Sequence, residues 1–389
     1  MRARWMVIVA TFLFQVYPAA AADQIKIGLI TTLSGPQAVM GNPMRDAASL
    51  ALEMLGGKIG GLPAEIVFGD DQQKPDVGRQ IIEKFLQKDH VDFITGVLGS
   101  NVLLAIYQPV INSKTVIISA NSGPHQIAGA MCSPYFFSTA SQNDESPEAM
   151  GQYMSDAGIN DVYVMAPNYA AGKDMIAGFK HRFKGKIAAE VYPAFGQHDY
   201  QAEISQIRAA KPKAVFVFFP GAMGIQFTKQ YAEAGLRDTI PLYSVFSADE
   251  GSLPALKDAA LGNYGAGFWS AQLNVPRSQE FVAAFRKKYG YLPANYGAST
   301  FDAIFLIDSA VKAVHGNLSD KKALIAALTK AEFPTVRESF AFNTNHFPIE
   351  NFYLFKVAKS GDDYVLNVNK TIFHAFKDSH ASECKMPAE

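Results

Sequence analysis

Short runs of β-branched and aromatic residues alternate with amphipathic stretches from residue 25 to residue 244, and this alternation constrains the fold most strongly. Apolar residues in the amphipathic stretches recur three and four positions apart, as at Val77, Ile81 and Phe85, which is the period of a helix. The strand-like runs are Ile25–Ile30, Ala64–Phe68, Val91–Gly96, Thr115–Ser119, Asp161–Ala166, Ile187–Tyr192, Ala214–Phe219 and Leu242–Ser244. The helical stretches are Pro43–Leu55, Asp76–Lys88, Pro147–Ala157, Gly172–Phe183, Ala202–Ala209 and Gly224–Ala234. The pattern predicts an α/β fold of parallel sheets with helices on both faces.

The alternation is interrupted at Tyr135–Pro147 and again at Gly262–Pro276. Three helical patterns and three strand-like runs follow, at Ser278–Tyr289, Ala294–His315, Asp320–Lys330, Ser339–Phe342, Phe352–Val357 and Tyr364–Val368. A chain of 389 residues is long for one core and suits two domains. Because α/β sheets present their binding loops at the carboxyl ends of their strands, two facing sheets predict a cleft that holds a small ligand.

The first residues have the pattern of a secretory signal. Arg2 and Arg4 precede the apolar run Trp5–Tyr17, and the small residues Ala19–Ala22 follow it. This order predicts a signal peptide over residues 1–22 that is cleaved after Ala22. A membrane anchor is the alternative, but the run is short for a bilayer span. We therefore expect a mature chain in the periplasm that does not insert into the membrane.

Charge and motifs argue against several classes of function. The formal net charge is −1, so no basic excess favours nucleic acid or an anionic membrane. The chain lacks a nucleophile elbow, a P-loop, a dinucleotide-binding fingerprint and a zinc-protease motif, and its eight histidines are scattered. We interpret Asp70-Asp71 as a solvated turn before a helix. The sequence predicts a protein that is not an enzyme and holds no metal or cofactor.

Cys132 and Cys384 are the two cysteines of the chain. Two cysteines in one exported chain usually pair, so we expect a disulfide between them, with two free thiols as the alternative. The bridge would connect the C-terminal tail, residues 376–389, to the segment before Tyr135.

The order of short motifs along the chain resembles the branched-chain amino-acid binding protein family, the type I periplasmic binding proteins of ABC transporters. The segments that carry the resemblance are Ile27–Pro36, Gly41, Gly56-Gly57, Asp70–Gln72, Leu86–Val91, Gly96–Ser100, Pro109, Ser119–Pro124, Tyr169–Gly172, Gly221–Ala234, Tyr296–Asp302 and Phe340–Tyr353. The resemblance implies two Rossmann-like lobes joined by three hinge crossovers, near residues 139–145, 265–272 and 338–346. The N-terminal lobe would comprise 23–140 plus 271–340, and the C-terminal lobe 141–270 plus 341–375.

The resemblance also implies where a ligand carboxylate would bind. Ser100 and the segment Ala120, Asn121 and Ser122 would hold it in the N-terminal lobe, with Asn101 and Met40 completing that side. Ser100 follows a glycine-rich turn, where free amides at the start of the next helix favour an anion. The alternative is that Ser100 and Ser122 only cap helices.

Two departures from the family affect the expected ligand. Amino-acid binders hold the α-ammonium with an aspartate after the first crossover, where this chain has Asn143, although a shift of one residue would place Asp144 there. A second acid usually comes from the other lobe, near the end of the strand in the stretch 242–247, and this stretch contains no acid here. A buried ammonium without anionic partners is poorly compensated. We therefore expect a carboxylate that carries no amine.

Aromatic residues of the C-terminal lobe would close over this ligand. We expect Tyr169, Phe219 and Phe246 to face it, and Phe218 to point into the core, because neighbours in a strand alternate faces. The segment 347–353 and the two cysteines resemble the subgroup that binds aromatic acids. The expected function is therefore binding of a benzoate-like or phenylpropanoid acid for an ABC permease. A binding protein for branched-chain or other amino acids, a sensory module of the same fold and a secreted hydrolase are the alternatives.

Overall fold

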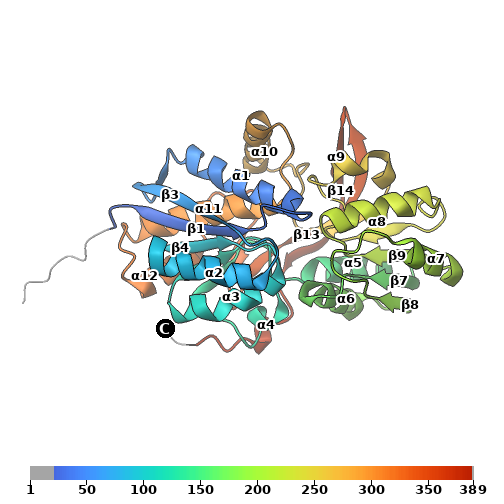
Figure 1. Ribbon diagram of the computed structural model, residues 1–389, viewed down its shortest axis with the longest axis horizontal. Helices are drawn as coiled ribbons and strands as arrows, with labels where there is room; N and C mark the ends of the chain where they lie inside the picture. The colour runs from blue at the N-terminus through green and yellow to red at the C-terminus, as the bar shows by residue number, and fades with distance from the viewer. Residues whose placement is uncertain (1–21, 388–389) are drawn as a thin grey trace, which may run out of the picture.

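The computed structural model describes residues 22–387, so most of the predicted signal peptide lies outside the described residues. The chain forms two sheets, each flanked by helices, in two lobes that lie side by side (Figure 1). This is the predicted α/β architecture of two helix-flanked lobes. No helix among residues 22–387 has the length and apolar character needed to cross a bilayer.

The first lobe contains a six-stranded sheet with strand order β2-β3-β1-β4-β5-β6. Its strands are β1 (Ile25–Thr31), β2 (Lys58–Ile59), β3 (Leu62–Asp70), β4 (Phe93–Gly96), β5 (Val116–Ser119) and β6 (Phe136–Ser138). All neighbours pair in parallel except β2, which is antiparallel to β3. The carboxyl ends of β1, β4 and β5 therefore lie at one edge of the sheet.

The second lobe contains an eight-stranded sheet with order β12-β13-β11-β10-β9-β7-β8, and β14 pairs with β13. Its strands are β7 (Asp161–Met165), β8 (Lys186–Val191), β9 (Ala214–Val217), β10 (Leu242–Ser244), β11 (Tyr264–Gly267), β12 (Ala341–Phe342), β13 (Pro348–Ser360) and β14 (Asp363–Phe376). The strands β7 to β11 are parallel to one another, whereas β13 is antiparallel to β11, β12 and β14.

Helices cover both lobes, and their pairing follows the lobe division. In the first lobe α1 packs on α11 and α2 packs on α3, and in the second α5 packs on α6. The longer helices are α1 (Ala38–Met54), α2 (Pro75–Lys84), α3 (Ser100–Asn112), α5 (Glu145–Asp156), α6 (Ala170–Arg182), α7 (Gln201–Ala210), α8 (Ala222–Glu233), α10 (Pro276–Tyr289), α11 (Asn295–Ala313) and α12 (Lys321–Lys330). The short helical turns are η1 (Phe85–Asp89), α4 (His125–Ala128), α9 (Leu253–Leu256), η2 (Lys257–Ala260) and η3 (Ala381–Glu383).

Two local expectations were wrong. Helix α1 begins at Ala38, five residues before the expected start at Pro43, and contains Pro43 in its second turn. Asp71 is fully buried, where we expected a solvated turn: its carboxylate accepts hydrogen bonds from the Thr32 hydroxyl at 2.5 Å and the Gln73 amide at 2.8 Å.

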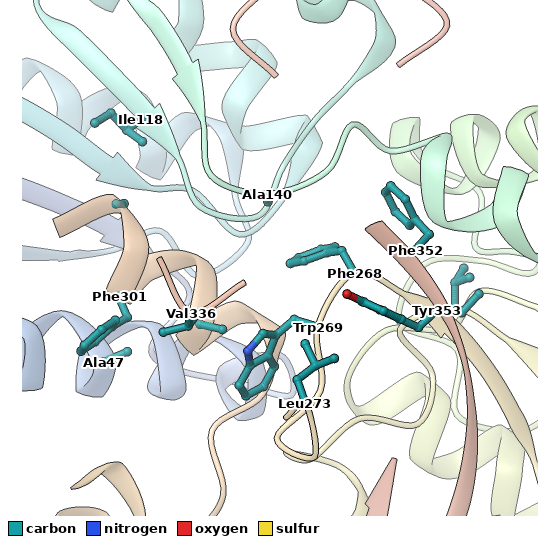
Figure 2. Close-up of a cluster of buried hydrophobic side chains, with 14 of the residues drawn as sticks. Ala47, Ile118, Ala140, Phe268, Trp269, Leu273, Phe301, Val336, Phe352 and Tyr353 are labelled. Carbon is teal, nitrogen blue, oxygen red and sulfur yellow. The ribbon is translucent and has the colours of Figure 1, made fainter. Parts of the chain in front are cut away.

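The chain passes between the two sheets three times, at residues 139–144, 268–275 and 331–340. Apolar side chains from both lobes meet at these crossovers, among them Ala140, Phe268, Trp269, Val336 and Tyr353 (Figure 2). The Trp269 indole is 2% exposed and donates a hydrogen bond to the Ser278 hydroxyl at 3.0 Å. The crossovers are thus part of one continuous apolar core.

Arg337 lies in the third crossover and is 4% exposed. Its guanidinium forms ion pairs with Asp302 of α11 at 2.7 Å and with Glu350 of β13 at 2.8 Å. It also donates to the carbonyl of Thr139 in the first crossover. One buried cation therefore links two crossovers and an element of each lobe.

The predicted disulfide between Cys132 and Cys384 is present, with 5.7 Å between the Cα atoms. Cys132 precedes β6 in the first lobe, whereas the tail that carries Cys384 leaves β14 of the second lobe. The tail also contacts the second lobe, because the Ser379 hydroxyl donates to the Glu148 carboxylate of α5 at 3.2 Å. The tail therefore spans both lobes.

Candidate ligand-binding site

A cavity lies between the lobes. Clefts between domains are preferred sites for small molecules. Its walls come from both lobes, at the carboxyl edges of the sheets and at the crossovers. The lining residues are Gln37, Met40, Gln73, Leu98, Ser100, Asn121, Ala140, Ser141, Asn143, Tyr169, Ala171, Met175, Phe195, Phe218, Pro220, Phe246, Phe268 and Tyr296.

Ser100 begins helix α3 and reaches the cavity at the carboxyl end of β4. The residue before it, Gly99, has no side chain to cap the helix. The first amides of a helix have no partner within the helix and carry part of its positive dipole. The Ser100 hydroxyl accepts from Asn143 Nδ2 at 3.2 Å, which leaves its own proton for a ligand. This helix start is suited to an anion.

Asn143 connects the two lobes beside Ser100. Its Oδ1 accepts from the Gly123 amide at 3.1 Å, and its Nδ2 donates to Asp174 of α6 at 2.8 Å as well as to Ser100. Asp144 points away from the cavity toward His380. Of the two residues that the sequence left open, Asn143 lines the cavity and Asp144 does not.

Asp174 of the second lobe makes a further contact with the first lobe. Its Oδ1 lies 2.8 Å from His125 Nδ1 of α4. Burial raises the pKa of the Asp174 carboxyl, and the hydrogen bonds from Asn143 and His125 oppose that rise. Since these contacts join helices of opposite lobes, the structure describes the lobes in a closed arrangement.

Three residues expected at the carboxylate side lie outside the cavity lining. The Ser122 hydroxyl donates to the Val97 carbonyl at 2.9 Å, and the Ala120 amide donates to the Gly96 carbonyl at 2.9 Å. Asn101 faces Gln73, with side-chain atoms 3.4 Å apart. The strand-end donors of Ala120 and Ser122 are therefore used within the protein, and none of the three residues is among those that line the cavity.

Asn121 and Gln73 supply further polar groups. Asn121 lines the cavity as expected, while its Nδ2 donates to the Leu98 carbonyl at 2.7 Å. Gln73 also lines the cavity and was not predicted. Its Oε1 accepts from the Thr32 hydroxyl at 2.9 Å, and the same hydroxyl donates to buried Asp71. The adjacent acids at 70–71 were the available sequence signal, since a strand end that carries polar residues marks the ligand edge of such a sheet.

Aromatic rings form most of the remaining wall. Tyr169 and Phe246 line the cavity as expected, and so does Met40. Tyr169 lies 4.7 Å from Phe195 and 6.3 Å from Phe218, between ring centroids. Burial raises the pKa of the Tyr169 hydroxyl, so Tyr169 is a neutral hydrogen-bond donor at physiological pH. Phe195, Phe268 and Tyr296 were not expected in the wall.

The expectation that Phe219 faces the cleft was wrong. Phe218 lines the cavity, whereas Phe219 is fully buried in a separate core cluster, with its ring centroid 5.0 Å from that of Tyr200. Its amide donates to the Ser247 hydroxyl at 2.7 Å.

Within residues 22–387, none of the residues that line the cavity is Asp, Glu, Lys, Arg or His. Two acids lie behind the wall: Asp174 accepts from Asn143 Nδ2 at 2.8 Å, and Asp249 accepts from the Tyr296 hydroxyl at 3.0 Å and from the Ser252 amide at 2.8 Å. Burial raises the pKa of the Asp249 carboxyl. An α-ammonium in this cavity would therefore have no direct anionic partner.

Residues 24–362 match the periplasmic binding protein family. This chain belongs to that family. Leu/Ile/Val-binding protein homolog 6 of Brucella melitensis is a relative with 24% identity over 360 residues, 90% of this chain and 91% of the relative.

Two solved structures of the family resemble this periplasmic binding protein closely. A solute-binding protein of an ABC transporter from R. palustris, in complex with benzoate, has 31% identity and a TM-score of 0.88 over 93% of this chain and 99% of that one. A solute-binding protein from Rhodopseudomonas palustris BisB5, in complex with 3,4-dihydroxybenzoic acid, has 30% identity and a TM-score of 0.86 over 92% and 99%.

Proposed function

We propose that this protein binds a small aromatic carboxylic acid between its lobes and delivers it to the permease of an ABC importer. The observation that carries the proposal is the cavity wall, which combines the start of α3 with aromatic rings and contains no charged side chain. The structural neighbours that hold benzoate and 3,4-dihydroxybenzoic acid support the same ligand class.

The carboxylate would accept hydrogen bonds from the Ser100 hydroxyl and from the free amides at the start of α3. A desolvated carboxylate needs several such donors, because an unpaired buried charge is very costly. Tyr169, Phe218 and Phe246 would surround the ring, which adds about 0.5–1.5 kcal/mol per stacked pair beyond the area buried. No bond of the ligand is made or broken, so the protein is not an enzyme in this proposal.

The lobes, residues 23–140 plus 271–340 and 141–270 plus 341–375, would move about the crossovers. A ligand that contacts both lobes only in the closed arrangement shifts the population toward closure. The closed surface would be the one that the permease recognises. Residues 1–22 would direct the chain to the periplasm and be removed after Ala22.

Titration calorimetry tests the ligand class with benzoate, cinnamate, leucine and short aliphatic acids. We expect benzoate or cinnamate to bind with a Kd near the micromolar range, about −8 kcal/mol, and leucine to bind far more weakly. Tighter binding of leucine would contradict the proposal and favour the amino-acid function that the names of the relatives suggest.

The variant Ser100→Ala tests the carboxylate site. It should weaken the binding of the preferred acid tenfold or more, about 1.4 kcal/mol. Ser49→Ala is a matched control, because the Ser49 hydroxyl donates to the Arg45 carbonyl within α1 and does not line the cavity. An affinity of Ser100→Ala equal to that of Ser49→Ala would remove Ser100 from the site.

A further inference from the structure

Gln37 presents a buried carbonyl oxygen that has no hydrogen-bond partner among residues 22–387. The residue is 5% exposed, lines the cavity and precedes the first residue of α1. A glutamine at this position could accept from its own helix, but its side chain makes no capping hydrogen bond. A buried carbonyl oxygen left unpaired is destabilising, so this oxygen requires a hydrogen-bond donor.

The neighbours of this oxygen leave room for it but offer no side-chain donor. A Cβ atom at Gly221, in the loop before α8 of the second lobe, would lie 2.2 Å from Gln37 Oε1 and 3.1 Å from Met40 Cε. Gly221 has a φ of +61°, a left-handed conformation that favours glycine. Pro220 beside it has no amide proton. The closed lobes therefore bring the Gln37 amide against the opposite wall without pairing its oxygen.

A benzoate ring alone cannot supply the missing donor, because its carboxylate only accepts hydrogen bonds and its other atoms are apolar. A ring hydroxyl can supply it. Such a hydroxyl can donate to Oε1 or, if the Gln37 amide is flipped by 180°, accept from Nε2. It therefore pairs with the amide in both orientations. Ser100 and Gln37 have different neighbours in the wall, Asn143 for the one and Gly221 for the other. The carboxylate and the hydroxyl would therefore be bound by separate polar groups.

We propose that Gln37 selects aromatic acids that carry a ring hydroxyl, so that the preferred ligand is a hydroxybenzoate-type acid rather than benzoate itself. This inference rests on the proposed function and adds to it the residue that distinguishes among aromatic acids. A site with a buried hydrogen-bonding group discriminates strongly against an analogue that lacks the matching group, because the site group is then left unpaired.

Calorimetry with benzoate and the three monohydroxybenzoates tests this selection. We expect the wild type to bind at least one isomer about tenfold or more tightly than benzoate, which corresponds to about 1.4 kcal/mol. In Gln37→Met, a replacement of similar size without hydrogen-bonding groups, that preference should fall to within about threefold. Gln37→Leu gives a second apolar replacement, and thermal melts establish that each variant is folded.

Gln108→Leu is the matched control, since Gln108 is exposed on α3 and should keep the wild-type preference. A wild type that binds benzoate as tightly as all three isomers would overturn the inference while leaving the aromatic-acid function intact. So would a hydroxyl preference that persists in both Gln37 variants. A wild type that binds none of the four acids would overturn this inference, and if it bound no cinnamate either, the proposed function would be overturned as well.

Discussion

Adjacent residues of this protein have different tasks, and Phe218 and Phe219 show it best. Phe218 faces the cavity and Phe219 packs against Tyr200 on the other side of the same sheet. Replacement of each phenylalanine by leucine separates binding from stability. Phe218→Leu should weaken aromatic-acid binding about two- to tenfold by removing ring contacts worth about 0.5–1.5 kcal/mol. Phe219→Leu should instead lower the melting temperature.

Calorimetry and thermal melts of the two leucine variants check this prediction. If Phe219→Leu weakened binding more than Phe218→Leu at a temperature where both are folded, the assignment of the two faces would be wrong.

The direction of these two rings also shows what sequence reasoning could and could not establish. Alternation along the strand was predicted correctly, since Phe216 and Phe218 share one core cluster and Val217 and Phe219 another. Which face looks into the cleft could not be predicted, because helices cover both faces of a parallel sheet and both faces are apolar. The unpaired oxygen of Gln37 was likewise invisible, because its environment depends on Gly221 of the other lobe.

Glu250 is expected to make stability depend on pH. Its carboxyl is 3% exposed and accepts from the Ala271 amide at 2.9 Å. Burial raises the pKa of this carboxyl from 4.5 to about 8, against the opposing effect of that hydrogen bond. Between these pKa values the folded protein keeps this proton while the unfolded chain releases it. The contribution of Glu250 to the free energy of unfolding is therefore complete below pH 4.5 and is lost as pH rises toward 8. One such group changes the free energy of unfolding by up to about 1.4 kcal/mol per pH unit.

Glu250→Gln should remove this part of the pH dependence. Urea unfolding of the wild type and the variant should give free energies that diverge as pH rises from 4.5 to about 8, with the variant becoming relatively more stable. Glu233→Gln, at an exposed position of α8, should run parallel to the wild type. Parallel curves for Glu250→Gln as well would show that Glu250 ionises normally.

The elements of the fold followed from the sequence more fully than the site did. Strand–helix alternation with continuous apolar strands placed both sheets and their covering helices, and the expected helix after Gly99 is α3. The strand β6 escaped detection because it is three residues long and is followed by a polar segment. The strands β13 and β14 are longer than predicted. Their additional residues pair with each other in a hairpin, but they show no alternation of apolar and polar residues that would mark a strand.

The third crossover depends on Arg337, and Arg337→Met should destabilise the protein by about 3–5 kcal/mol. The change leaves Asp302 and Glu350 buried without their cation. Chemical denaturation measures the loss. Adding Glu350→Gln to Arg337→Met should recover part of it, because the second variant removes one uncompensated charge. A loss below about 1 kcal/mol for Arg337→Met would show that the network is dispensable.

At the scale of the whole molecule, the disulfide joins residues that are 252 positions apart. In the chain-entropy account such a closure stabilises the fold by about 5 kcal/mol. The double variant Cys132→Ser, Cys384→Ser should therefore unfold at a lower temperature and a lower denaturant concentration. Reduction of the wild type should lower its stability by a similar amount and leave the double variant unaffected. Equal stability before and after reduction would mean that the tail contributes nothing.

The disulfide also affects how far the two lobes can separate. Cys384 lies eight positions after Phe376, the last residue of β14, and eight extended residues reach at most about 29 Å. The disulfide-bonded tail is therefore a fourth covalent connection between the lobes, in addition to the three crossovers. With the disulfide intact, the length of the tail should limit how far the lobes of the unliganded form can separate. Reduction of the disulfide should let the lobes of the unliganded protein open further. Solution scattering should then give a larger radius of gyration for the reduced protein than for the oxidised one.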